Sequence, residues 1–172
     1  MIERKVTISL FLLMFTGMLD AQRLLPDPRY DRNGVPDWKI DQEFGHDVFT
    51  FVRVRYSSWN RNQGKWSTDY PDSDLNFSYR LQQLTSMQVD PNGKILELTD
   101  KELFNYPFLY MIEPGHIELR DDEIKALRKY LLNGGFLMID DFWGSQEWDN
   151  FAFEMRRVFP KRKFTELDLK HP

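Results

Sequence analysis

The chain has 172 residues, which leaves room for one domain with an ordinary hydrophobic core. Its formal net charge of −4 gives no strongly basic footprint, so nucleic acid is not an expected partner. Cysteine is absent, which excludes disulfides, thiolate metal sites and cysteine nucleophiles.

The N-terminus, residues 1–21, has the three-part layout of a bacterial signal peptide. Arg4 and Lys5 are basic, and an apolar run follows over residues 6–19. That run is shorter than the roughly 20 residues that a membrane-spanning helix needs. Since Ala21 suits the last position before a cleavage site, we expect export to the periplasm with cleavage before Gln22. The alternative is an uncleaved N-terminal membrane anchor, and no second apolar run of membrane length follows.

One α/β domain is expected from residue 48 to residue 172. The preceding segment, residues 22–47, is rich in Pro, Asp, Arg and Gly without periodicity, which is typical of an irregular lead-in. Residues 49–56 (FTFVRVRY) alternate between apolar and polar types and predict a first strand. The loop that follows runs to Pro71, and loops of this length often carry function.

A helix and two strands are expected next. The helix runs from residue 72 or 73 to residue 87, with Ser73 and Asp74 as its N-terminal cap. A short strand is expected over residues 95–98 and a longer one over residues 107–112. The second strand (PFLYMI) is continuously apolar, which favours a parallel strand covered on both faces.

The last third repeats this alternation. Residues 121–132 predict a helix with acids in its first turn and an Asn-Gly-Gly stop, and residues 136–139 predict another buried strand. A helix over residues 146–159 and a further strand over residues 163–166 complete the pattern. Alternating strands and helices predict a mostly parallel sheet with helices on both faces.

Four stretches of the chain carry a family resemblance. They are FVRVRY (51–56), WSTDYP (66–71) with Asp74 and Leu75, LRKYLLNGGFL (127–137) and DDFW (140–143). Through them, residues 49–172 resemble the bacterial family called domain of unknown function 4159.

The resemblance implies a class I glutamine-amidotransferase-like fold, which is a flavodoxin-like three-layer sandwich, similar in outline to trehalose-utilisation-type domains. It also implies an exported or membrane-associated protein. Two features depart from that pattern. The chain has neither the cysteine of glutamine amidotransferases nor a Gly-x-Ser-x-Gly elbow, so the resemblance supports the fold and not the reaction. Similar domains also continue beyond a position like His171, so we expect the domain to be truncated at its C-terminus.

Candidate functional residues follow from the fold class. In an open parallel sheet, ligands bind outside the carboxyl ends of the strands. Three predicted strand ends and their loops therefore give the candidate ligand-binding rim, which consists of Tyr56, Trp59, Trp66, Asp69, Tyr70, Glu113, His116, Asp140, Asp141 and Trp143.

The rim residues leave alternatives open. Adjacent side chains of a strand point to opposite faces, so one of Asp140 and Asp141 would face the rim while the other caps the next helix. The aromatic rim residues would stack on sugars or a protein partner, or would close the end of the sheet as a minor core. Glu113 and His116 are compatible metal ligands, but their spacing is not a recognised motif, so neither a metal nor a cofactor is predicted.

Two functions are compatible with these residues. The first is a non-catalytic binding or scaffolding module in the cell envelope, with a carbohydrate or an envelope protein as partner. The alternative is a carbohydrate-active or other hydrolase in which Glu113 and Asp140 or Asp141 act as paired carboxylates. The absence of a Cys or Ser nucleophile motif argues against an enzyme.

Overall fold

The computed structural model describes residues 32–45, 47–59 and 64–171. The expected signal peptide lies outside these ranges, as do residues 22–31 and 46 of the expected lead-in. The chain divides into two compact units, Met1–Gly34 and Val35–Pro172, and every element below belongs to the second unit. The predicted domain start at residue 48 stays a prediction.

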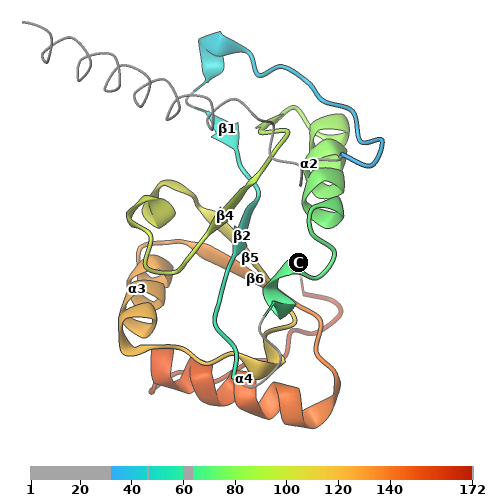
Figure 1. Cartoon of the computed structure of the whole chain (residues 1–172). Coiled ribbons are helices and arrows are strands. Elements are labelled where there is room, and N and C mark those ends of the chain that lie inside the picture. Colours follow the sequence, from blue (N-terminus) through green and yellow to red (C-terminus); the bar gives the residue numbers. More distant parts are fainter. Residues whose placement is uncertain (1–31, 46, 60–63, 172) are drawn as a thin grey trace, which may run out of the picture. The chain divides into compact units, whose positions relative to one another are not determined.

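The central sheet has four parallel strands (Figure 1). They are β2 (Val52–Val54), β4 (Lys94–Leu96), β5 (Phe108–Ile112) and β6 (Phe136–Asp140). Their order across the sheet is β4-β2-β5-β6, and every neighbouring pair is parallel. Counted along the chain as first to fourth, this order is 2-1-3-4, with which the flavodoxin-like order begins. The predicted α/β class with a parallel sheet is confirmed, and the arrangement is consistent with a flavodoxin-like sandwich.

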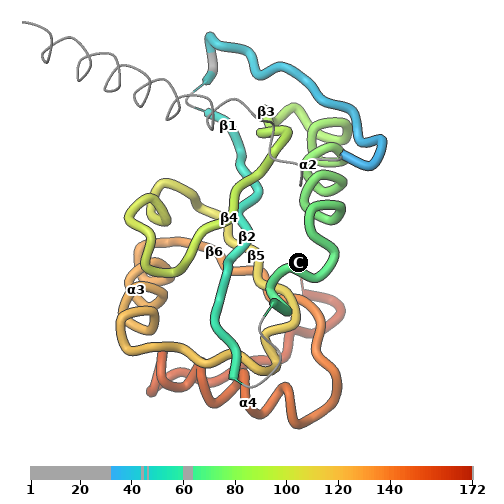
Figure 2. The backbone as a smooth tube through the Cα atoms, in the orientation of Figure 1, coloured from blue at the N-terminus to red at the C-terminus, as the bar shows by residue number. Residues whose placement is uncertain are grey.

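Two short strands precede the central sheet. β1 (Val48–Phe49) and β3 (Gln88–Val89) pair in parallel, and Figure 2 shows the backbone running from β1 into β2 and from β3 into β4. Residues before β1 contact this pair, because the indole Nε1–H of Trp38 donates to the Val89 carbonyl over 2.7 Å. Part of the expected lead-in is therefore attached to the sheet.

Three α-helices flank the central sheet: α2 (Asp72–Leu84), α3 (Asp121–Leu132) and α4 (Gly144–Val158). Short 3₁₀ turns lie between the main elements, namely η2 (Gln42–Phe44), η4 (Lys65–Ser67), η5 (Lys101–Asn105) and η6 (Pro114–His116). Along the described ranges, no helix combines the length and apolarity that crossing a bilayer would require.

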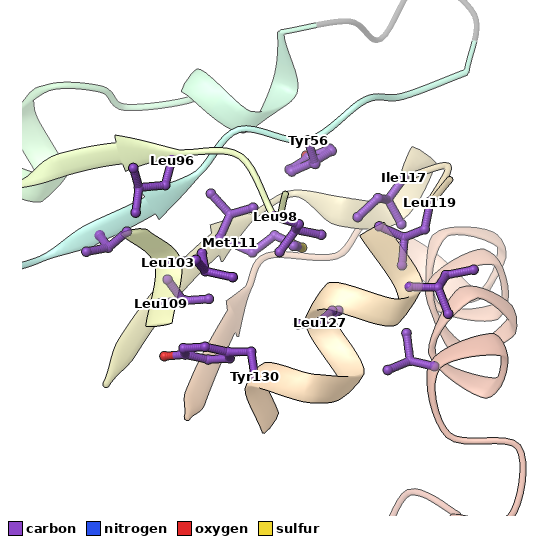
Figure 3. Packing of buried hydrophobic residues seen from close by; sticks show 14 of the residues in the cluster. Tyr56, Leu96, Leu98, Leu103, Leu109, Met111, Ile117, Leu119, Leu127 and Tyr130 are labelled. Atoms are coloured by element: carbon purple, nitrogen blue, oxygen red, sulfur yellow. The ribbon is translucent and has the colours of Figure 1, made fainter. Parts of the chain in front are cut away.

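The larger hydrophobic core lies where α3 and α4 cover the sheet. Strand alternation turns Val52 and Val54 of β2 and Leu109 and Met111 of β5 to the same side, where all four are buried. Figure 3 shows how residues of α3, among them Leu127 and Tyr130, complete this cluster. It is the ordinary core expected from the periodicity of the sequence.

The opposite face of the sheet is aromatic and is covered by α2. Phe51, Tyr110 and Ile112 are buried there, with Phe108 packed against them. Phe77 of α2 stacks on Phe108, with ring centroids 6.0 Å apart and an interplanar angle of 19°. The same face contains the fully buried side chain of Arg53.

Strand β6 was predicted to be buried, and that prediction is wrong. β6 is the last strand of the sheet, and its residues on the α2 side are open, with Phe136 59% and Met138 38% exposed. The predicted strand over residues 163–166 is also absent from the described structure. Phe164 packs on Trp148 of α4 instead, with centroids 4.9 Å apart.

The start of α2 differs from the prediction in its cap. Pro71 occupies the N-cap position, and no side chain caps the helix there. Ser73 and Asp74 face a buried guanidinium instead, because Arg53 donates to both of them. The helix ends at Leu84. The next residue, Thr85, has an extended backbone, and its hydroxyl donates a hydrogen bond to the Leu81 carbonyl.

Candidate functional site

The carboxyl ends of β2, β5 and β6 lie at one edge of the central sheet. After β2 the chain continues to β4 on one side, whereas β5 is followed by β6 on the other side. The ends of β2 and β5 therefore flank the topological switch point, where ligands bind in open α/β sheets. Trp59, Glu113 and His116 lie in the segments that leave these two strands.

A cluster of charged side chains surrounds Lys65 at this point. The Lys65 ammonium forms an ion pair with the Glu113 carboxylate. That hydrogen bond raises the pKa of Lys65, and the charges of Glu113, Glu147 and Asp141 act in the same direction. We call these four residues, together with His116, the Lys65 cluster.

Helix α4 is held against the same cluster through Glu147. Glu147 accepts a hydrogen bond from the backbone N–H of Trp143 over 2.9 Å, and its other oxygen lies 3.6 Å from Nδ1 of His116. Gly115 permits this approach, because a Cβ on it would lie 2.4 Å from the Glu147 Cβ. The ring of Trp59 lies 5.2 Å from the His116 ring, which joins the loop after β2 to the same place.

The predicted aromatic group divides into exposed and covered members. Trp143 is 71% exposed and Trp59 is 37% exposed, so both present ring surface to solvent. Trp66 packs against the larger core, and Tyr70 lies beside Arg53, with 5.8 Å between its ring centroid and the guanidinium carbon. The structure thus brings two of the four rings to the surface of the rim.

Tyr56 belongs to the interior rather than to the rim surface. Its hydroxyl lies 2.8 and 2.7 Å from the carbonyl oxygens of Ile112 and Glu113, which share its single proton in a bifurcated hydrogen bond. Burial, followed by the nearby carboxylates of Glu113 and Glu147, raises the pKa of this hydroxyl. Tyr56 therefore ties the end of β2 to the end of β5.

The three aspartates of the predicted rim have different positions. Asp140 accepts a hydrogen bond from the Tyr110 hydroxyl over 3.0 Å, on the α2 side of the sheet. Asp141 and Asp69 are exposed and have left-handed backbones, with φ of 64° and 56°. Of these residues, Asp141 is the one whose charge reaches the Lys65 cluster.

A buried charge pair at the start of α2 was missed from the sequence. Arg53 is fully buried, and its Nε lies 3.0 Å from both carboxylate oxygens of Asp74. Its Nη1 donates to the carbonyls of Trp66 and Thr68 over 2.9 and 3.1 Å. Arg53 thus fixes the loop before α2, and we call this set of bonds the Arg53 clamp. The sequence feature that could have revealed this pair is the position of Arg53. Its side chain points to the same side of the strand as that of Phe51, which is buried.

A polar pocket of about 200 Å³ was also missed. It lies at the carboxyl ends of β2 and β4, next to the first turn of α3, and we call it the Arg55 pocket. Its lining includes Arg55, Ser57, Trp66, Glu97, Arg120 and Glu123. Burial raises the pKa of the Glu123 carboxyl above its ordinary value. Sequence spacing could not reveal the pocket, because its members come from four separate segments.

The charged groups of the rim are largely paired with one another. Within the described ranges, no group of three or more His, Asp or Glu side chains is arranged to hold a metal ion. The Glu113 carboxylate, which the hydrolase alternative needs, is occupied by the Lys65 ammonium. Among the predicted rim residues, the exposed ones are Trp59, Trp143, Asp69, Asp140 and Asp141.

Comparison with known families places most of the chain in a family. Residues 50–172 match the family described as Domain of unknown function (DUF4159). The chain belongs to this family. No curated protein matches the chain.

Most of the four stretches that resemble the domain of unknown function 4159 family have structural roles. The first two stretches meet in the Arg53 clamp. In the third, Arg128 donates from Nε and Nη2 to the carbonyls of Val158 and Arg157 over 2.6 and 2.7 Å, at the end of α4. In the fourth, Phe142 packs on Phe151, whereas Trp143 is exposed. In this chain, these residues therefore serve mainly to hold the domain together.

Proposed function

We propose that this protein is an exported, non-catalytic binding module of the cell envelope, whose rim binds its partner through the exposed rings of Trp59 and Trp143. The observation that carries the proposal is that the rim has a paired carboxylate but an exposed aromatic ring. The carboxylate of Glu113 is paired with the Lys65 ammonium, whereas Trp143 is 71% exposed to solvent. Exposed aromatic rings with a polar tip suit contact with a partner.

Export rests on the sequence of residues 1–21, with its basic start and apolar run. A periplasmic protein, or one anchored at its N-terminus, would meet envelope glycans and envelope proteins. Both classes offer surfaces on which a tryptophan ring stacks, and carbohydrate is the class that we propose to test first.

The test is a glycan array combined with thermal-shift measurements on a panel of sugars. The variant Trp59→Ala/Trp143→Ala removes both exposed rings, and Phe153→Ala is the control, since Phe153 is 55% exposed on α4. We expect a glycan that binds the wild type and the control to be lost by the double variant. If no sugar binds, a protein partner at the same rings is the expected occupant. Equal binding by all three proteins would contradict the proposal.

The hydrolase alternative is separated by product analysis. Wild type, Glu113→Gln and Asp141→Asn are incubated with each bound glycan, and released sugars are measured. We expect no products from any of the three proteins. Turnover by the wild type that both variants lose would identify a paired-carboxylate enzyme and overturn the non-catalytic proposal.

A further inference from the structure

The Arg55 pocket has the position of a ligand site. It opens at the carboxyl ends of β2 and β4, the same edge of the sheet that carries the Lys65 cluster. Its volume of about 200 Å³ is below the range of about 300–1,000 Å³ typical of drug-sized ligands. A pocket of this size suits one small ring rather than an extended molecule.

The charges of the pocket are balanced. Arg55 uses Nε and Nη2 on a single oxygen of Glu97, over 3.1 and 2.8 Å, so its Nη1 and the second Glu97 oxygen are not used by this pair. Arg120 makes long contacts, with 3.3 Å to Asp122 and 3.4 Å to Glu123. The lining thus presents guanidinium donors and carboxylate acceptors side by side, with little net charge.

One wall of the pocket is aromatic and is held in place. Trp66 lies beneath the Arg55 guanidinium, whose central carbon is 5.9 Å from the ring centroid. The Trp66 backbone is fixed by the Arg53 clamp through its carbonyl. A wall that is already positioned costs little conformational entropy when a ligand binds.

This combination selects a ligand class. A hydroxyl group both donates and accepts hydrogen bonds, so it can use the guanidinium and carboxylate groups together. An anion would meet the Glu97 carboxylate, and an apolar ligand would bury charges without partners. The partly buried indole of Trp66 adds an apolar edge that the carbon atoms of a sugar ring can contact.

We infer that the Arg55 pocket binds a single neutral sugar residue, whose hydroxyls bond to Arg55, Glu97 and Arg120 beside the ring of Trp66. This inference rests on the proposed binding function and names the ligand class of the same rim. The sugar would be free or would be one residue of a longer glycan that continues over the exposed rings.

The test follows the indole N–H resonances of the five tryptophans in ¹⁵N-labelled protein. Glucose and N-acetylglucosamine are the neutral probes, and glucuronate and inorganic phosphate are the charged ones. We expect the neutral sugars to shift the Trp66 resonance. Tighter binding of glucuronate or phosphate at the same resonance would identify an anion site, and an unmoved Trp66 resonance would also overturn the inference.

Variants assign the effect to the pocket. Arg55→Gln/Glu97→Gln removes both charges of an exposed pair, and Arg120→Gln is a second, independent change. Each should weaken sugar binding about tenfold or more, the loss expected when charge-assisted hydrogen bonds are removed. Arg80→Gln, on the exposed side of α2, is the matched control and should bind as the wild type does. Unchanged affinity in both pocket variants would place the sugar elsewhere.

The failure of this inference differs from the failure of the proposed function. A sugar that shifts the resonance of Trp59 or Trp143, but not that of Trp66, would support binding at the rim and overturn binding in the Arg55 pocket. An unmoved Trp66 resonance, together with partner binding that survives the loss of both exposed rings, would overturn both the pocket inference and the proposed function.

Discussion

At the scale of single residues, Arg53 shows how the fold accommodates a charge in its interior. A fully buried guanidinium is tolerated only when its donors are satisfied, and Arg53 has partners in Asp74, Ser73 and two loop carbonyls. The clamp connects β2, the loop before α2 and α2 itself. A side chain in the middle of a strand therefore positions the loop that carries Trp66.

Arg53→Met should lower the free energy of unfolding by about 3–5 kcal/mol, because it leaves the Asp74 carboxylate buried without its partner. Denaturant unfolding measures the change. Arg55→Met, two residues along the same strand, is the control and should cost less than about 1 kcal/mol, since its pair with Glu97 is exposed. Arg53→Met/Asp74→Leu should recover part of the loss. Equal losses in Arg53→Met and Arg55→Met would contradict the clamp.

Glu123 gives a prediction for the pH dependence of stability. Because burial raises its pKa, the folded state holds the proton more tightly than the unfolded state. The stabilising contribution is therefore full below the ordinary pKa of 4.5 and is lost as the pH rises through the raised pKa of the folded state.

Glu123→Gln cannot titrate, so its difference from the wild type isolates this contribution. We expect the wild-type free energy of unfolding, minus that of Glu123→Gln, to fall as the pH rises from 4 towards neutrality. Urea unfolding at each pH measures it. A difference that grows with pH would mean that Arg120 stabilises the ionised carboxylate more strongly than burial opposes it.

At the scale of elements, the sequence predicted what local chemistry determines. The bounds of α3 follow from acids in its first turn and an Asn-Gly-Gly stop, and the structure has the helix at Asp121–Leu132 as expected. The burial of β6 could not be read from FLMID, because an apolar run does not tell whether a strand is central or last in the sheet.

The candidate site was predictable in part. The rule for strand ends selected Glu113, His116 and Asp141, and the structure brings the three into the Lys65 cluster. Lys65 was missed because its partner Glu113 lies 48 residues away in the sequence. Contacts of that separation depend on the order of the strands, which no local pattern specifies.

The docking of α4 on η6 gives a prediction at this scale. Gly115→Ala places a Cβ 2.4 Å from the Glu147 Cβ, so α4 must shift away from the rim. We expect a loss of about 1–3 kcal/mol in thermal or urea unfolding, as is usual for overpacking. Gly45→Ala is the control, since the nearest atom to its added Cβ is a backbone oxygen at 3.5 Å. A Gly115→Ala protein as stable as the control would contradict the close approach of α4.

At the scale of the whole molecule, the proposed binding function in the cell envelope requires that the protein is exported. The sequence of residues 1–21 predicts a mature chain that starts at Gln22. The intact mass of protein recovered from the periplasm measures this start. A mass that includes Met1 would contradict cleavage and would favour the uncleaved N-terminal anchor.

The open side of β6 is the other feature that concerns the whole molecule. Phe136 and Met138 present an apolar surface, and Phe108 continues it, with its ring 5.9 Å from that of Phe136. This surface lies on the α2 face of the sheet, whereas the proposed partner is assigned to the strand ends. Binding at the rim should therefore survive a polar substitution such as Phe136→Thr.

The most direct test of rim binding is crosslinking in the cells that produce the protein. A photoreactive phenylalanine analogue is placed at position 143, and at position 153 of the exposed side of α4 as a control. We predict a crosslinked adduct with an envelope glycan or protein from position 143 and none from position 153. Equal adducts from both positions, or none from position 143, would contradict a partner at the rim.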